Sequence, residues 1–263
     1  MERMEVGLGR RLVPYREGWD LQRAVHAQVV AGTRPSTLIA LEHEDVYTVG
    51  RRTRSWERPA GDFVEPGHVP VIDVDRGGKT TWHGPGQLTV YPVVRLAHPV
   101  DVIAYVRALE AAVMEVCAAH GVGTTRVEGR SGVWVPPPDA SGAPGAGGAG
   151  RGARAGGGTD VARGRGEKKI CALGVRVARG VTMHGIGLNV CPDLAVFDLD
   201  RIVPCGIRDA GVTSLAAQAG PAASSCLRAA DLSAQVLTAL ETHLAPLVAD
   251  PTPRPPSDLG LKS

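Results

Sequence analysis

The residues best suited to chemistry lie between Asp75 and Pro92, a stretch that reads DRGGKTTWHGPGQLTVYP. The glycines predict a tight turn leading into a strand, because glycine adopts positive φ and lets a backbone approach a ligand closely. Backbone N–H groups freed by such a turn can hold an oxygen that gains negative charge. We therefore expect a site for a small acyl or carbonyl group, with the amides supplied by the Gly77-Gly78 turn or by the backbone near His83.

A cysteine between proline and glycine offers a possible nucleophile. Cys205 lies in the loop sequence Val203-Pro-Cys-Gly-Ile, where a thiol is more exposed than inside an apolar run. Nucleophile and packed thiol both remain open on this ground alone. The other four cysteines lie in or beside apolar strand and helix patterns, and we expect them to be packed: Cys117, Cys171, Cys191 and Cys226.

Two lysines, Lys168 and Lys169, stand immediately before an apolar strand pattern. A lysine in that position is usually solvated, and it gains chemical meaning only if the fold brings it to a cysteine. In that case the ammonium would lower the thiol pKa from about 8.5 to roughly 7 or below. The lower pKa would favour the thiolate, which is the reactive form.

The sequence contains no pattern for a metal or a nucleotide cofactor. His83 and His184 each precede glycine and can equally be structural histidines, and no HExxH or HxH spacing accompanies them. The Gly77-Gly78 pair belongs neither to a P-loop nor to a GxGxxG fingerprint. We predict that the protein uses no metal and no cofactor.

Composition limits the class of protein. The chain has 263 residues, 43% of them apolar, and a formal net charge of +2, which gives no reason to expect nucleic acid or a membrane. Five irregularly spaced cysteines favour reduced thiols, and the N-terminus lacks an apolar signal segment. We expect a cytoplasmic protein with one large domain.

Hydrophobic periodicity predicts a mixed α/β (α+β) domain around one central sheet. Helices are expected to open at Asp20, Asp101 and Asp231, the second ending at Gly121, and residues 41–52 to turn outward. Arg179-Gly180 predicts a hairpin between the last two strands. The expected strands span residues 36–41, 69–74, 87–96, 132–135, 169–177 and 181–190.

One segment differs from the rest in composition. Eleven of the 32 residues from Pro136 to Glu167 are glycine and none is aromatic, so we expect a disordered surface insertion. Its arginines resemble an RG-rich tract that could bind RNA, although a solvated linker has the same composition. We predict one catalytic domain over residues 1–250, interrupted at 136–167, and a flexible tail over 251–263.

Four ordered motifs resemble the lipoyl(octanoyl) transferases, which move an octanoyl group from acyl carrier protein to a lysine of lipoate-dependent complexes. The looser run at residues 41–50 also fits, and the order and spacing agree from about Val29 to Ala245. The motifs are RGGKTTWHGPGQ at 76–87, KICALG at 169–174, HGIGLN at 184–189 and PCGI at 204–207.

The resemblance implies a fold shared with biotin and lipoate protein ligases, a mixed sheet flanked by helices. It implies that Cys205 is an acyl-thioester nucleophile and that Lys169 lowers the thiol pKa and shuttles protons. By the same resemblance the acyl pocket maps onto Arg76, Gly77, Gly78, Lys79, Thr80, Thr81, Trp82 and His83, onto Ala172, Leu173 and Gly174, and onto Gly185, Ile186 and Gly187.

The implied activity is the first step of endogenous protein lipoylation. The donor would be octanoyl-acyl carrier protein, and the acceptors would be lipoyl domains of 2-oxoacid dehydrogenase complexes and the glycine cleavage H protein. We expect Arg51, Arg52, Arg54 and Arg76 either to dock an acidic partner or to be ordinary solvated arginines. The alternatives are an ATP-dependent lipoate or biotin ligase and an RNA- or partner-binding protein acting through the insertion.

Overall fold

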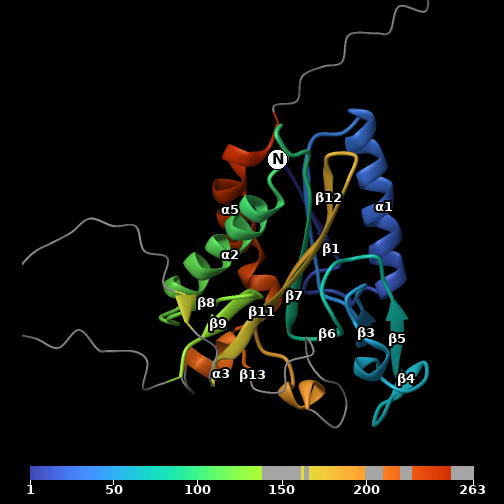
Figure 1. Cartoon of the computed structure of the whole chain (residues 1–263), viewed down its shortest axis with the longest axis vertical. Helices are drawn as coiled ribbons and strands as arrows, with labels where there is room; N and C mark the ends of the chain where they lie inside the picture. Colours follow the sequence, from blue (N-terminus) through green and yellow to red (C-terminus); the bar gives the residue numbers. More distant parts are fainter. Residues whose placement is uncertain (138–160, 163–165, 199–209, 220–226, 250–263) are drawn as a thin grey trace, which may run out of the picture.

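A nine-stranded mixed sheet forms the centre of the protein, as a computed structural model of the chain shows (Figure 1). The structure describes residues 1–137, 161–162, 166–198, 210–219 and 227–249. Across the large sheet the strands run in this order: β1 (Glu2–Val6), β2 (Thr37–Leu41), β7 (Gln87–Val93), β12 (Val181–Asn189), β11 (Lys168–Ala178), β9 (Arg130–Val135), β8 (Thr125–Val127) and β10 (Val161–Ala162), with β13 (Gly211–Val212) beside β11.

A second sheet lies beside the first, so the prediction of one sheet was wrong. Its strands are β4 (Phe63–Val64), β5 (Val69–Asp73), β3 (Val46–Val49) and β6 (Thr81–His83), in that order. Strand β3 falls within residues 41–52, which we expected to turn outward, and all four of its residues are buried. The charged residues that flank it concealed a strand that pairs with both β5 and β6.

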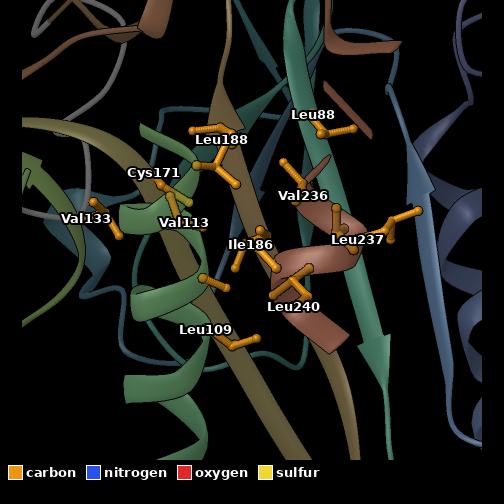
Figure 2. Close-up of a cluster of buried hydrophobic side chains, with 14 of the residues drawn as sticks. Leu88, Leu109, Val113, Val133, Cys171, Ile186, Leu188, Val236, Leu237 and Leu240 are labelled. Atoms are coloured by element: carbon orange, nitrogen blue, oxygen red, sulfur yellow. The ribbon is translucent and has the colours of Figure 1, made fainter. Parts of the chain in front are cut away.

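The largest hydrophobic core fills the space between the large sheet and two helices (Figure 2). Helices α2 (Val102–Ala119) and α5 (Ala229–Leu244) pack against each other and cover this face. Leu109 and Val113 of α2 meet Ile186 and Leu188 of β12 in the core, and all four are at least 98% buried. Burial of such side chains stabilises a fold by about 1.5–3 kcal/mol each.

Helix α1 (Tyr15–Ala31) covers the opposite face of the large sheet (Figure 1). Val25 and Val29 pack there with Ile39 of β2 and Tyr91 of β7. The helix begins five residues before Asp20, the predicted start, because Pro14 occupies the N-cap and no capping side chain marks the position. Gly32, in the left-handed conformation, ends it.

Predictions that depend on clear local signals are confirmed. Asp101 caps α2 by accepting a hydrogen bond from the Ala104 N–H at 2.9 Å. Arg179 and Gly180, both at positive φ, form the turn of the β11–β12 hairpin. The last helix begins at Ala229, so Asp231 lies in its first turn and is not its cap, in contrast to our prediction.

Shorter elements complete the part of the chain that the structure describes. They are the helix α3 (Leu215–Ala219) and three 3-10 turns at Ser55–Glu57, Leu194–Phe197 and Ala245–Leu247. No helix within the described ranges is long and apolar enough to cross a bilayer. Most of the predicted insertion, at 138–160 and 163–165, and the predicted tail lie outside the described residues. Glu167, at the end of that insertion, is buried.

We predict that Leu240→Ala lowers the free energy of unfolding by about 2–5 kcal/mol, because the side chain is fully buried between α5 and the sheet. Urea unfolding of the full chain measures this change. The control is Ile103→Ala on α2, where the side chain is 74% exposed and the expected change is within about 0.5 kcal/mol. Equal losses in the two variants would contradict the assigned core.

Candidate functional site

A cavity of about 290 Å³ opens between the two sheets and contains most of the predicted site. Strands β11 and β12 supply one side, and β6 with the turn before it supplies the other. The predicted residues that line it are Arg76, Gly78, Lys79, Thr81, His83, Lys169, Ala172, Leu173, Gly174, Gly185, Ile186 and Gly187.

Strand register explains why two distant motifs meet here. Ala172 pairs with Gly187 and Gly174 with Gly185 across the β11–β12 hairpin. A Cβ on Gly174 would lie 2.8 Å from Arg76 Cδ, so only glycine lets the Arg76 turn approach the sheet. The absence of side chains brings the two sheets close enough to form one cavity.

Among the predicted residues that the structure describes, three do not line the cavity. Gly77 and Thr80 lie in the turn next to it, and the Trp82 side chain packs against Phe197 in the core of the small sheet. Trp82 Nε1 also donates to Asp45 Oδ1 at 3.0 Å. The Gly77 N–H donates to the Val175 carbonyl at 3.0 Å, so of the amides that we expected to hold an oxyanion this one is already bonded within the protein.

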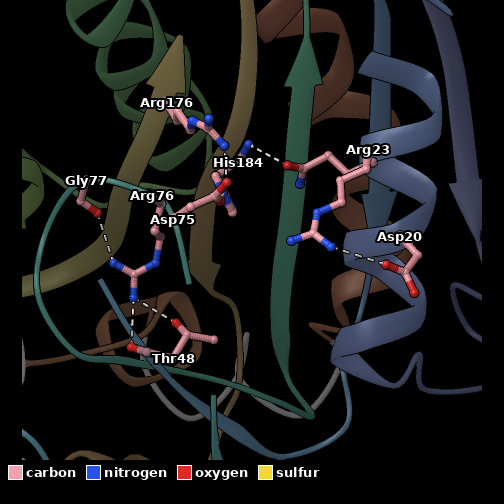
Figure 3. A network of polar contacts seen from close by, with 9 residues as sticks. Asp20, Arg23, Thr48, Asp75, Arg76, Gly77, Arg176 and His184 are labelled. Carbon is pink, nitrogen blue, oxygen red and sulfur yellow. Dashed lines mark hydrogen bonds and ion pairs between the residues drawn. The ribbon is translucent and has the colours of Figure 1, made fainter. Parts of the chain in front are cut away.

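Arg76 holds the turn between the sheets through its guanidinium (Figure 3). Nη1 donates to the carbonyls of Gly77 at 3.0 Å and Lys79 at 2.8 Å, and Nη2 donates to the Thr48 carbonyl at 2.9 Å and hydroxyl at 2.7 Å. The residue is only 5% exposed. Both alternatives that we expected for Arg76, a docking surface and an ordinary solvated arginine, were therefore wrong, because its guanidinium is buried and bonded to internal groups.

Asp75 joins the same turn to strands β11 and β12 of the large sheet (Figure 3). Its Oδ1 accepts from His184 Nε2 at 2.7 Å, and its Oδ2 pairs with Arg176. The hydrogen bond from His184 lowers the pKa of Asp75 to about 2. Burial lowers the pKa of His184 itself, so a neutral imidazole donates to an ionised carboxylate. His184 adopts a φ of 58° and its backbone N–H donates to Gln22 of α1.

A chain of hydrogen bonds fixes the tautomer of His83. Asn189 Nδ2 donates to the Thr213 carbonyl, so Asn189 Oδ1 accepts from Gln87 Nε2 at 2.9 Å. Gln87 Oε1 is then the acceptor for His83 Nδ1–H at 2.7 Å. Burial lowers the pKa of His83 well below its ordinary value. His83 is therefore neutral, with Nε2 as its acceptor nitrogen.

A second buried histidine is fixed in the same way. His43 Nδ1 lies 2.9 Å from the Val13 carbonyl, which can only accept, so this nitrogen carries the proton. Nε2 then accepts from the Tyr91 hydroxyl at 2.6 Å. Burial lowers the pKa of His43 to about 4. Local sequence carries little signal for His43, because its hydrogen-bond partners are 30 and 48 residues away.

Lys169 lies at the start of β11 with only 7% of its surface exposed. Its Nζ is 4.5 Å from the ring centroid of Trp134, a cation–π contact. Gly132 lies against the Lys169 side chain at a φ of 127°, and a Cβ on this glycine would be 3.1 Å from Lys169 Cε. The buried carboxylate of Glu110 accepts from the Gly132 N–H at 3.2 Å and from Arg126 Nε at 3.0 Å, which fixes this backbone.

The described cysteines are poorly suited to be nucleophiles. Cys117 and Cys171 are buried in the main core, as predicted, and burial raises the pKa of Cys117 to about 12. Cys191 is exposed just beyond the end of β12, so the prediction that it is packed was wrong, and burial still raises its pKa. Cys205 and Cys226 lie outside the described residues.

Several lining residues were not among the predicted pocket residues. Tyr15, Tyr91 and His184 line the interior, whereas Arg52, Gly129, Arg130 and Ser131 line the cavity near the turn and β9. Tyr91 follows Gln87 at an even spacing on the same strand face, a signal that could have identified it once the Gln87 face was assigned to the site. Tyr15 comes from a helix whose start the sequence did not mark.

Comparisons with known proteins agree with the expected resemblance. The lipoyl protein ligase A/B catalytic domain family matches residues 14–241. An octanoyltransferase of Thermobifida fusca is 53% identical over 212 residues, which are 80% of this chain and 78% of the relative. An octanoyltransferase of Salinispora tropica is 46% identical over 234 residues, 89% of this chain and 91% of the relative.

A solved structure supports the fold. A lipoate-protein ligase A bound with ATP superimposes with a TM-score of 0.52 at 15% identity, covering 94% of this chain and 85% of that chain. At this identity the likeness concerns the fold alone. It confirms the expected lipoate-ligase-like arrangement of a mixed sheet flanked by helices.

We predict that Asp75→Asn lowers the free energy of unfolding at pH 7 by about 1–3 kcal/mol. The folded-state pKa of about 2 lies below the ordinary value of 3.8, so the carboxylate stabilises the fold above that value. The contribution is lost as the pH falls through about 2. Urea unfolding should show a smaller loss of unfolding free energy in Asp75→Asn at pH 3 than at pH 7. An equal loss at both pH values would show that the ionised carboxylate does not stabilise the fold.

Proposed function

Because the chain belongs to the lipoyl protein ligase A/B catalytic domain family, we propose that it is an acyltransferase that transfers octanoyl groups for protein lipoylation. The observation that supports this most strongly is the high identity, over most of the chain, to relatives named octanoyltransferase. The cavity between the sheets supplies a place for the acyl group, lined by backbone and apolar atoms of β11 and β12 next to a buried lysine.

The first step makes an acyl-enzyme. The Cys205 thiolate attacks the carbonyl carbon of octanoyl-acyl carrier protein, and the carbonyl becomes a tetrahedral oxyanion. The carbon–sulfur bond to the carrier then breaks. The carrier's thiolate leaves and takes a proton from Lys169, and the octanoyl group stays on Cys205 as a new thioester.

The second step transfers the group to a protein. The amine of an acceptor lysine attacks the Cys205 thioester, an amide bond forms, and the carbon–sulfur bond to the enzyme breaks. Lys169 accepts the proton that the amine loses and restores the thiolate. No ATP enters either step, because a thioester is already activated.

The position of Lys169 supports its proposed role. It lines the cavity, and its ammonium is held over Trp134 above a glycine that leaves room for its side chain. A positive charge next to a thiol lowers the thiol pKa. The raised pKa values of Cys117, Cys171 and Cys191 argue against each of them in place of Cys205.

The partners we propose are an acyl carrier protein as donor and lipoyl domains and the H protein as acceptors, in the cytoplasm. The catalytic domain would span residues 1–250 with the insertion at 136–167. Arg51, Arg52 and Arg54 are exposed next to the cavity, and Arg52 lines it, so they form a cationic surface that fits an acidic carrier.

An ATP-dependent ligase of the same fold is the main rival. Such an enzyme would activate a free acid as an adenylate and would need no cysteine. The two activities separate experimentally on ATP dependence and on the requirement for Cys205.

We predict that the purified chain gains one octanoyl group from octanoyl-acyl carrier protein without ATP, and that Cys205→Ser does not. Intact-mass spectrometry measures the adduct. The matched control is Cys191→Ser, which removes an exposed thiol and should leave the adduct unchanged. An unmodified wild type, or an equal adduct on Cys205→Ser, would show that the proposed nucleophile is wrong.

We predict that the Michaelis constant for the carrier rises with salt. Salt screens the attraction between the exposed arginines and an acidic carrier, and at 0.1 M the screening length is about 10 Å. The double variant Arg51→Glu with Arg54→Glu should raise it roughly threefold or more at low salt. Arg179→Glu, at the hairpin turn at the other end of β11, reverses one positive charge away from the site and should have little effect. Steady-state kinetics at low and high salt measure this change. A Michaelis constant that does not change with salt would contradict the proposed docking surface.

A further inference from the structure

The strand register gives the cavity a direction. Lys169 lies at the start of β11, and Gly174 lies five residues further along the same strand, on the order of 16 Å at about 3.3 Å per residue. Both line the cavity. The acyl thioester belongs at the Lys169 end, so the end of the acyl chain points toward Gly174.

Tyr91 occupies the level of Gly174 on the neighbouring part of the sheet. Ile186 pairs with Val90 and Gly174 pairs with Gly185, which places Tyr91 beside Gly185 in the register. At this level β11 and β12 carry glycine, whereas β7 carries an aromatic ring that lines the cavity and is 3% exposed. The ring is therefore the bulky group at the inner end.

His43 holds this ring in place. The Tyr91 hydroxyl donates to His43 Nε2 at 2.6 Å, and His43 Nδ1 donates to the Val13 carbonyl at 2.9 Å. Helix α1 packs on the imidazole so closely that a Cβ on Gly18 would lie 2.8 Å from His43 Cε1. Neither ring can move without breaking a buried hydrogen bond or displacing the helix.

Further rings close the surroundings of this end. Tyr15 of α1 also lines the cavity and lies 5.0 Å from His43, centroid to centroid. His184 lies 6.5 Å from Tyr91, edge-on, and Asp75 holds it from the other side (Figure 3). The inner end is a wall of aromatic and imidazole rings, each held by packing or by a hydrogen bond.

We propose that the Tyr91–His43 pair is the end wall of the acyl cavity and limits the length of the acyl chain. The inference rests on the proposed function. Burial alone discriminates poorly, because one methylene is worth about 0.8 kcal/mol, roughly fourfold in affinity. A rigid wall excludes chains longer than octanoyl by steric overlap, which costs more than a methylene gains.

The test compares octanoyl, decanoyl and dodecanoyl groups, each loaded on acyl carrier protein, with the full chain. Intact-mass spectrometry gives the rate of adduct formation for each. Tyr91→Leu replaces the ring by a smaller side chain and so lengthens the cavity. It should raise the dodecanoyl-to-octanoyl rate ratio at least tenfold over wild type. Tyr105→Leu is the matched control, since Tyr105 is equally buried on the opposite face of the sheet, in the α2 core, and should leave the ratio unchanged.

The outcomes separate the inference from the proposed function. An octanoyl adduct with an unchanged ratio in Tyr91→Leu would overturn the end wall and leave the acyltransferase intact. No octanoyl adduct on wild type would overturn the proposed function and the inference with it.

A second measurement uses only the wild type, in case Tyr91→Leu does not fold. An octanoyl chain with a diazirine at its terminal carbon is loaded through the carrier and photolysed, and the crosslinked peptide is sequenced. We expect the crosslink on Tyr91, Tyr15 or His43. A crosslink on Gly129, Arg130 or Ser131, which line the cavity from the β9 side, would overturn the proposal.

Discussion

The close contact between the two sheets is the constraint on which the site depends. Arg76 makes that contact with a buried guanidinium that bonds Thr48 of the small sheet and the carbonyls of its own turn. Gly174 makes the contact possible, since a larger residue would collide with the Arg76 side chain. A buried guanidinium is costly unless it is hydrogen-bonded, so the four bonds made by the Arg76 Nη1 and Nη2 atoms favour this position of the turn.

That one position sets the geometry of the cavity. The turn carries Lys79 and leads into Thr81 and His83, which face β11 and β12 across the cavity. On the large sheet the same contact leaves Lys169 at one end and the Tyr91–His43 pair at the other. The proposed acyl transfer needs a reactive end and an inert end, and the cavity offers a lysine at one end and buried rings at the other.

Local signals in the sequence were sufficient for much of the fold. The Asp101 cap, the Arg179-Gly180 turn and the apolar strands are decided within a few residues, and each was predicted correctly. Strand β3 was missed because its flanking residues are charged, and only pairing with β5 and β6 makes it a strand. The start of α1 was missed because Pro14 caps it without a side-chain hydrogen bond.

In the candidate site, too, some features could be predicted from the sequence and others could not. Glycine-rich motifs identified the turn and the β11–β12 hairpin, because close backbone approach leaves a trace in composition. The internal use of Arg76 and the His43–Tyr91 pair left no such trace, since both depend on contacts between residues 28 and 48 positions apart. Arg76, which we had placed among surface arginines, is instead buried and lines the cavity.

The most direct test of the account is a single-turnover transfer. Octanoyl-enzyme, freed of carrier protein and of ATP, is mixed with an unmodified lipoyl domain, and both proteins are weighed over time. We expect the octanoyl group to leave the enzyme and to appear in equal amount on one lysine of the lipoyl domain. An octanoyl group that stays on the enzyme, or moves only when ATP is added, would contradict it.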